Sequence, residues 1–207
     1  TMSERPARSA ILCVTANLAM DVTYELDQLV PGGTHRARRV AQRAGGKGVN
    51  VARILHRLGH PVCAVGAAGG ARGREIEADL ADSGVPYELA HIRGDSRRTV
   101  TLVAEGTATL VNEPGPELSR AEWSDLSTMV QRSLAGSSVL VLAGSLPRGA
   151  ATAAGYADLI ASATQHGVPT VLDTSGAALR TGVAAGPAIV KPNADELSEI
   201  TGYTDPI

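Results

Sequence analysis

The sequence predicts an α/β fold with a mostly parallel central sheet flanked by helices. Short aliphatic runs alternate with longer helical patterns, which is typical of crossover units around such a sheet. Gly and Pro separate these segments and mark the turns. Because the 207 residues include no Phe and one Trp, the core must be aliphatic. A chain of this length is expected to form one large domain over residues 1–207.

Short apolar runs give the expected strands of the central sheet. They consist mainly of Val, Ile and Leu and carry no charge, as strands buried on both faces do. The expected strands cover residues 11–14, 62–65, 139–142, 170–172 and 188–190.

Helices are expected between these strands, and two of them carry clear end signals. An apolar stripe over residues 49–58 ends at Gly59. Ser119 followed by Glu122 forms a capping box, which opens a helix that runs to about residue 135. Further helices are expected over residues 74–81 and 153–165 and from Asn193 onward.

Two polar stretches interrupt this alternation, at about residues 22–43 and 96–112. Both are rich in β-branched residues and partly alternating, so they are expected to be strands that project outside the main sheet. In the second stretch, Glu105-Gly106-Thr107 is a plausible hairpin turn. Together the strands would form a small lid over the carboxyl edge of the sheet, where open α/β sheets bind ligands.

Composition and charge exclude several classes of protein. The formal charge of −2 gives no reason to expect binding to nucleic acid or to an anionic membrane. Cys13 and Cys63 lie within apolar runs, where Cys usually serves as a small buried hydrophobe rather than in a disulfide. Residues 1–10 are not followed by an apolar stretch long enough for a signal peptide or a membrane span. A cytoplasmic protein is therefore expected.

The segment Gly45-Gly46-Lys47-Gly48-Val49-Asn50 is the first candidate for a binding site. It brings unhindered backbone N–H groups, a helix N-terminus and a lysine to one point, which favours an anion or a hydroxyl-rich ligand. It is not a Walker A loop, because Ala41 and Gly48 occupy positions that require Gly and Ser or Thr. Alternatively, the glycines only form a tight turn into the helix.

Four further motifs follow in a characteristic order around this glycine loop. They are Asn17-Leu18-Ala19-Met20-Asp21, Asn112-Glu113-Pro114-Gly115-Pro116-Glu117, Gly144-Ser145-Leu146-Pro147 and Lys191-Pro192-Asn193-Ala194-Asp195-Glu196. In this order they resemble the PfkB-type sugar kinases of the ribokinase superfamily, closest to the 1-phosphofructokinase and tagatose-6-phosphate kinase branch. Leu18 stands where the family usually has proline.

The resemblance implies roles on the substrate side of a kinase site. Asp21 would accept hydrogen bonds from sugar hydroxyls, and Lys47 would contact the substrate phosphate. Two arginines would bind the same phosphate: Arg36, after Gly33-Thr34-His35, and Arg97, in a segment that resembles the family's Thr-Arg-x-Asn. The remaining implied substrate-binding residues are Gly45, Gly46, Asn50 and Ser145.

The resemblance also implies ATP and Mg²⁺. Lys191 and Asn193 would lie near ATP, while Asn193 and Glu196 would organise metal-bound water. The same Asn and Glu also form a capping box, and both roles can hold together. The family's catalytic Asp lies in a Gly-Ala-Gly-Asp helix start that does not occur before Ile207. The chain by itself is therefore expected to lack full activity, whether it is a fragment or a cleavage product.

The expected reaction is ATP-dependent phosphorylation of a phosphorylated ketohexose, with fructose 1-phosphate converted to fructose 1,6-bisphosphate. Tagatose 6-phosphate or another sugar is the near alternative, and a non-catalytic sugar-phosphate binding protein comes from another class. A nicotinamide-dependent oxidoreductase is suggested by the glycines of residues 66–70, although their spacing misses Gly-x-Gly-x-x-Gly. Open edges of the lid strands suggest a homodimer.

Overall fold

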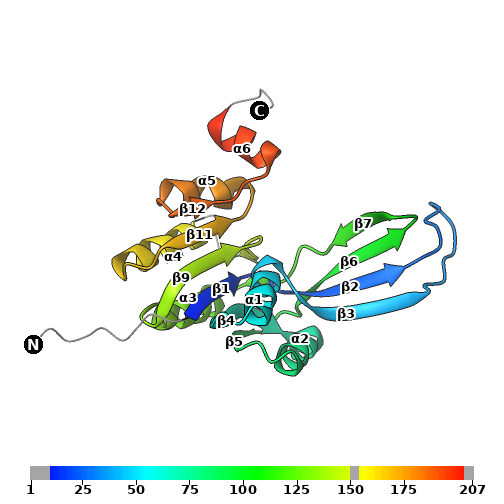
Figure 1. Ribbon diagram of the computed structural model, residues 1–207, viewed down its shortest axis with the longest axis horizontal. Helices are drawn as coiled ribbons and strands as arrows, with labels where there is room; N and C mark the ends of the chain where they lie inside the picture. Colours follow the sequence, from blue (N-terminus) through cyan, green and yellow to red (C-terminus); the bar gives the residue numbers. More distant parts are fainter. Residues whose placement is uncertain (1–9, 150–153, 203–207) are drawn as a thin grey trace, which may run out of the picture.

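A computed structural model describes residues 10–149 and 154–202, and it consists of a layered body and a projecting lid (Figure 1). The body is built on a six-stranded sheet in the order β12-β11-β9-β1-β4-β5, in which every pairing is parallel. Its strands are β1 (Ala10–Thr15), β4 (Val62–Gly69), β5 (Tyr87–Ile92), β9 (Ser137–Ala143), β11 (Thr170–Asp173) and β12 (Ile189–Val190). The predicted α/β class is confirmed.

Helices cover both faces of this sheet. They are α1 (Lys47–Arg57), α2 (Gly70–Asp82), α3 (Arg120–Leu134), α4 (Gly155–Gln165), α5 (Gly176–Ala184) and α6 (Ala194–Thr201). Val49 of α1 and Ile76 of α2 belong to one buried cluster, whereas Leu126 of α3, Leu159 of α4 and Leu179 of α5 belong to another. In the described part of the chain, no helix has the length and apolar character that crossing a membrane requires.

The lid is a four-stranded sheet that extends away from the body (Figure 1). Its order is β3-β2-β6-β7, and the strands are β2 (Ala19–Glu25), β3 (Arg39–Gly45), β6 (Arg97–Ala104) and β7 (Thr107–Asn112). Glu105 and Gly106 form the turn between β6 and β7 with φ angles of 49° and 75°, so both adopt the left-handed conformation of a tight hairpin. A short parallel pair, β8 (Glu117–Leu118) with β10 (Arg148–Gly149), lies outside both sheets.

All five expected body strands are present, and so are both expected capping boxes, at the starts of α3 and α6. β2 and β3 extend beyond the stretch expected over residues 22–43, and residues 26–38 connect them without strand structure. The start of the helix expected from residue 153 lies outside the described residues, and α4 is seen from Gly155. The sequence did not predict β5 or α5, which complete the alternation of strands and helices.

The two cysteines are free thiols, as expected from their apolar surroundings. Cys13 is buried in β1, and Cys63 is half-buried in β4. Burial raises the pKa of Cys13 to about 12 and that of Cys63 to about 11. Both therefore remain protonated at neutral pH and behave as small apolar side chains.

Candidate functional site

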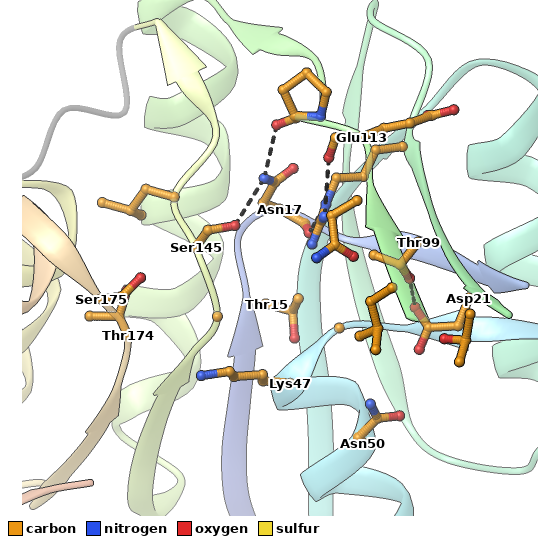
Figure 2. Close-up of a pocket in the computed structure, with 18 of the residues that line it drawn as sticks. Thr15, Asn17, Asp21, Lys47, Asn50, Thr99, Glu113, Ser145, Thr174 and Ser175 are labelled. Atoms are coloured by element: carbon orange, nitrogen blue, oxygen red, sulfur yellow. Dashed lines mark hydrogen bonds between the residues drawn. The ribbon is translucent and has the colours of Figure 1, made fainter. Parts of the chain in front are cut away.

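A cleft of about 650 Å³ lies between the carboxyl edge of the body sheet and the lid (Figure 2). The ends of β1, β9 and β11 form its body side, and β2, β6 and β7 form its lid side. The body side includes Thr15, Gly144, Ser145, Thr174 and Ser175, and the lid side includes Asp21, Thr23, Thr99, Thr101 and Asn112. Polar side chains from distant segments thus meet where open α/β sheets bind ligands.

The glycine loop packs directly on the end of β1. A side chain at Gly46, whose φ is 112°, would come within 2.4 Å of Thr15, and one at Gly48 would come within 2.6 Å of the carbonyl oxygen of Val14. Thr15 Oγ1 accepts a hydrogen bond of 3.0 Å from the N–H of Val49. The glycines therefore permit a close approach of backbone to backbone, and the same loop brings Gly46 and Lys47 into the lining of the cleft.

Asp21 lies on the lid side, at the base of β2, and is half-buried. Thr99 Oγ1 donates a hydrogen bond to its carboxylate, and Gly45 lies against the same group. A side chain at Gly45 would come within 2.0 Å of the Asp21 carboxylate, so only glycine leaves it room. Asn50, one turn into α1, lines the cleft beside it (Figure 2). The carboxylate and the amide together suit a ligand that carries hydroxyl groups.

Lys47 extends across the floor of the cleft from the glycine loop towards β11 (Figure 2). Its Nζ lies 2.7 Å from Asp173 Oδ1, while Lys191 Nζ lies 3.3 Å from Asp173 Oδ2. The Asp173 side chain is 15% exposed, whereas the Lys47 and Lys191 side chains are 52% and 69% exposed, so both ion pairs remain largely open to solvent. Asp173 thereby joins the glycine loop to the Lys-Pro-Asn segment.

Arg97 is held at the junction of the body and the lid. Its Nε donates to the carbonyl oxygen of Asn17 at 3.2 Å, and its Nη1 donates to that of Glu113 at 3.2 Å. Burial lowers the pKa of Arg97, and the charges of Asp21 and Glu113 oppose that shift. The guanidinium remains cationic, because arginine does not deprotonate in proteins. It has five N–H donors, so these two bonds leave capacity to bind an anion.

Ser145 follows β9 and lies beside Asn17, which follows the neighbouring strand β1 (Figure 2). Asn17 Nδ2 donates to Ser145 Oγ at 3.1 Å and to the carbonyl oxygen of Pro114 at 3.4 Å. Among the described residues, Asn17 Oδ1 and Thr174 Oγ1 are buried polar atoms without a hydrogen-bond partner. Buried polar atoms are normally satisfied, so these two atoms in the lining of the cleft have the capacity to bond a polar ligand or water.

Of the predicted substrate-binding residues, Gly45 and Arg36 do not line the cleft: Gly45 lies behind the lining against Asp21, whereas Arg36 lies away from the cleft. It belongs to the connection between β2 and β3, at the end of the lid, and is exposed. There it borders a separate shallow hollow together with Asp27 and His35. Within a single chain the structure therefore does not bring Arg36 together with Lys47 and Arg97, and its role in binding phosphate stays a prediction. Two seven-residue strands separate this connection from the body, a span of about 23 Å at 3.3 Å per residue.

Lys191, Asn193 and Glu196 lie beside the cleft rather than in its lining. Asn193 Oδ1 accepts the N–H of Glu196 at 2.8 Å, and Glu196 Oε2 accepts the N–H of Asn193 at 2.8 Å. No cluster of three or more His, Cys, Asp or Glu side chains suited to a metal occurs in the described residues. The segment therefore offers no protein cage for Mg²⁺, but one carboxylate beside phosphate groups fits an ion that retains most of its water.

The structure also brings residues into the site that sequence reasoning did not assign to it. Asn17 belongs to the motif that ends at Asp21, but the family resemblance implied a binding role only for Asp21. Thr174 and Ser175 directly follow β11, and residues just after parallel strands share one edge of the sheet. Arg43 pairs with Asp21 in the register of β2 and β3 and also lines the cleft.

The glycines near residues 66–70 have a packing role, which removes the support for a dinucleotide site. A side chain at Gly69 would come within 2.0 Å of the carbonyl oxygen of Ile92, and one at Gly70 would come within 2.2 Å of Asp95. Glu88 lies near the beginning of β5 rather than at its carboxyl end, where a ribose-binding acid belongs. These glycines let β4 and α2 approach the segment that follows β5.

The chain is an α/β protein whose cleft, between the body and the lid, combines cationic side chains with carboxylate, amide and hydroxyl groups. Residues 10–206 match the pfkB family carbohydrate kinases, and the chain belongs to this family. It is 34% identical over 195 residues to the tagatose-6-phosphate kinase of Staphylococcus epidermidis strain RP62A, covering 93% of this chain and 63% of that one.

Two solved structures of phosphofructokinase-2 from Escherichia coli have the same fold. The tetrameric inhibited form is 31% identical with a TM-score of 0.86, covering 96% of this chain and 66% of that one. The complex with fructose-6-phosphate is 30% identical with a TM-score of 0.86, covering 95% and 65%. The chain thus spans less than two thirds of the length of these relatives.

Proposed function

We propose that the protein to which this chain belongs transfers a phosphoryl group from ATP to a phosphorylated ketohexose. The first candidate reaction converts fructose 1-phosphate to fructose 1,6-bisphosphate. The supporting observation is that Asp21, Lys47, Asn50, Arg97 and Ser145, from four separate segments, meet in one cleft between the body and the lid. Carboxylate, amide and hydroxyl groups suit sugar hydroxyls, while the two cations suit a phosphate.

In the proposed site, the positively charged side chains bind the phosphate and other groups hold the sugar. In this proposal Arg97 binds the phosphate through its planar fork, and Lys47 turns from Asp173 towards the same anion. Arg43 adds a third cation from the lid. Asp21 accepts a sugar hydroxyl, and its bond from Thr99 fixes the orientation of its carboxylate. The lid keeps bulk water from the reacting phosphate.

The nucleotide side is proposed to begin at the Lys-Pro-Asn segment. Lys191 is linked to the cleft through Asp173, and the positive end of the α6 dipole lies close behind it in the chain, which favours phosphate. Bound Mg²⁺ would neutralise charge on the ATP phosphates. Glu196 would hold water of that ion with the carboxylate oxygen that does not serve the capping box.

Tagatose 6-phosphate is the second candidate substrate. It is favoured by the 34% identity to a tagatose-6-phosphate kinase, whereas the E. coli phosphofructokinase-2 complex contains fructose-6-phosphate. All of these compounds are ketohexose monophosphates, so one arrangement of cations and hydroxyl-binding groups serves each of them. The choice between them is a question of where the phosphate lies relative to the reacting hydroxyl.

We also propose that the lid strands pair two copies of the chain. All residues of β7 are exposed, and Val40, Leu110 and Val111 place apolar side chains on the surface of the lid. An exposed strand edge with apolar neighbours favours pairing with another chain. The E. coli relative forms a tetramer in its inhibited state. Light scattering after size-exclusion chromatography tests this proposal, and a monomeric mass would contradict it.

The reaction is tested with the full-length product of the gene. ATP turnover would be measured with fructose 1-phosphate, tagatose 6-phosphate, fructose 6-phosphate and ribose under identical conditions. The proposal expects turnover of at least one ketohexose phosphate and little or none of ribose. Turnover of ribose alone would contradict the proposal of a phosphorylated substrate.

A matched pair of variants tests the phosphate-binding role. Arg97→Met removes a guanidinium from the cleft, whereas Arg98→Met removes its exposed neighbour, which does not line the cleft. Loss of a hydrogen bond to a charged group predicts a KM for the sugar phosphate raised about 10- to 100-fold in Arg97→Met. Arg98→Met should stay near wild type. Equal effects of the two substitutions would contradict the assignment.

A further inference from the structure

The glycine loop is held from outside the cleft by one ion pair. Asp79 of α2 and Arg53 of α1 form this pair next to Ala44, the residue just before Gly45. The Arg53 and Asp79 side chains are 13% and 30% exposed, and Ala44 is fully buried. Neither charged residue lines the cleft. The pair therefore acts on the site, if at all, through the backbone that it touches.

Both polar groups of Ala44 are bound by this pair. Its N–H donates to Asp79 Oδ2 at 2.8 Å, and its carbonyl oxygen accepts from Arg53 Nη2 at 3.3 Å. Arg53 Nη2 also donates to Asp79 Oδ2, which closes the ring. Because β3 is an edge strand of the lid, the outward N–H and C=O groups of Ala44 have no neighbouring strand. The ion pair takes the place of that strand at this one residue.

A displacement of Ala44 would disturb the cleft, because the residues that follow Ala44 are closely packed. Gly45 lies against the Asp21 carboxylate, and the loop is fixed at its other end by the bond from Val49 to Thr15. A shift of Ala44 would therefore move Gly45 against Asp21 and change the direction in which Lys47 leaves the loop. This arrangement of Arg53, Asp79 and Ala44, the clamp, joins α1 and α2 to the end of β3, directly before the glycine loop.

We infer that Arg53 and Asp79 are positioning residues for the substrate side of the cleft. They fix Ala44 and thereby set Gly45, Asp21 and Lys47 in the arrangement that receives a sugar phosphate. This inference rests on the proposed function for its ligand, although the clamp itself does not. A partly buried charge that loses its partner is unfavourable, so removal of either side chain should release the backbone at Ala44.

The first measurement is amide hydrogen exchange without ligand, followed by NMR. Asp79→Asn should speed exchange at Ala44 by about tenfold, because the N–H of Ala44 loses its charged acceptor. Arg53→Met removes the donor to the Ala44 carbonyl oxygen and the ionic partner of Asp79, so it should speed exchange by a smaller factor. Glu25→Gln is the matched control, because it breaks the exposed ion pair to Arg39 at the far end of the same strand. Exchange at Ala44 should be unchanged in that control. Unchanged exchange in Asp79→Asn would overturn the clamp.

The second measurement separates positioning from general stability. In the full-length protein, Asp79→Asn should raise the KM for the hexose phosphate about tenfold while the KM for ATP stays the same. Asp79→Glu keeps the carboxylate and should recover most of the sugar affinity. Faster exchange at Ala44 with an unchanged sugar KM, or equal losses for sugar and ATP, would overturn the positioning role.

Two further outcomes are a variant that does not fold and a wild-type protein that does not use a hexose phosphate. If Arg53→Met does not fold, Arg53→Lys keeps the charge but loses the planar fork, and the same two measurements apply to it. If the wild-type protein uses no hexose phosphate, the proposed function fails. The exchange measurement at Ala44 then still decides whether the ion pair holds the loop, because it requires no ligand.

Discussion

The body and the lid are both β-sheets, but they are stabilised in different ways. In β4 of the body, seven of the eight residues are buried, whereas every residue of β7 in the lid is exposed. The body sheet is covered by helices on both faces and packs two aliphatic clusters. The lid contributes Met20, Val22 and Ala44 to one of these clusters, all from β2 and the end of β3.

This difference separates stability from ligand binding. The body is fixed by buried aliphatic side chains, and it carries the ends of β1, β9 and β11 that form the floor of the cleft. The lid is anchored at its base, while its outer strands have few buried contacts, as is common for elements that close over ligands. The residues that join the two parts, around Ala44 and Arg97, therefore determine how the cleft is shaped.

The comparison predicts its largest effect in the body core. Leu140 of β9 is completely buried, whereas Leu110 of β7 is 61% exposed. Leu140→Ala should lower the free energy of unfolding by about 3 kcal/mol, because it removes buried methyl groups and leaves a cavity. Leu110→Ala should change it by less than about 0.5 kcal/mol. Urea denaturation measures both, and similar losses would break the distinction between body and lid.

The second prediction concerns the junction of the two parts. Gly45→Ala places a methyl group against the Asp21 carboxylate and should destabilise the chain by about 1–3 kcal/mol, the usual cost of overpacking. Binding of the sugar phosphate, measured by calorimetry, should be lost, since Asp21 must move. Gly136→Ala is the control, because a side chain at Gly136 would meet open space and the φ of this residue is not positive. Undiminished binding in Gly45→Ala would contradict the role of Asp21.

The third prediction uses pH to test a contact within the body. Hydrogen bonds from the Ser119 side chain, from the Arg93 backbone and from the Ser119 backbone lower the pKa of Glu122 from 4.5 to about 2. The folded-state pKa is depressed, so this stabilisation is present above about pH 4.5 and is lost as the pH falls towards 2. Glu122→Gln should cost about 1 kcal/mol at pH 7, the value of a helix cap.

The difference in stability between wild type and Glu122→Gln should then narrow below about pH 4, because the wild-type carboxyl becomes protonated there. Thermal unfolding at a series of pH values would follow it. A gap that stays constant down to pH 2 would show that the charge of this carboxylate does not contribute.

The smallest effect is expected at the tip of the lid. Glu105 adopts a φ of 49°, which Asn tolerates better than Glu in a two-residue hairpin turn. Glu105→Asn should therefore stabilise the chain by a few tenths to about 1 kcal/mol. Chemical denaturation checks the sign. A clear destabilisation would indicate that the Glu105 side chain has a role outside the turn.

Much of the body could be predicted from the sequence, because its strands are uninterrupted aliphatic runs. β5 was missed since Glu88 and His91 interrupt its apolar pattern, as is normal for a strand at the edge of a sheet. In the site, the order of the motifs predicted that Asp21 and Lys47 lie in one cleft, and the structure shows that they do. Arg36 could not be placed, since neighbouring residues in sequence do not reveal where a long connection leads.

Contacts that depend on the alignment of strands and helices also could not be predicted from the sequence. Arg53 and Asp79 belong to ordinary amphipathic helices, and nothing in either segment indicates that both reach Ala44. Asn17 and Thr174 likewise gain their importance from the strands that they follow. The sequence therefore predicts which motifs belong to the site, while the positions of the residues behind them require the structure.

The most direct test of the central claim is hydrogen exchange of this chain with and without a ketohexose phosphate. We expect slower exchange in residues 45–50 and 97–112, which form the glycine loop and the lid side of the cleft. Exchange in α3 and α4 should change little. Protection confined to the body helices, with the loop and the lid unchanged, would contradict the assignment of this cleft to the sugar phosphate.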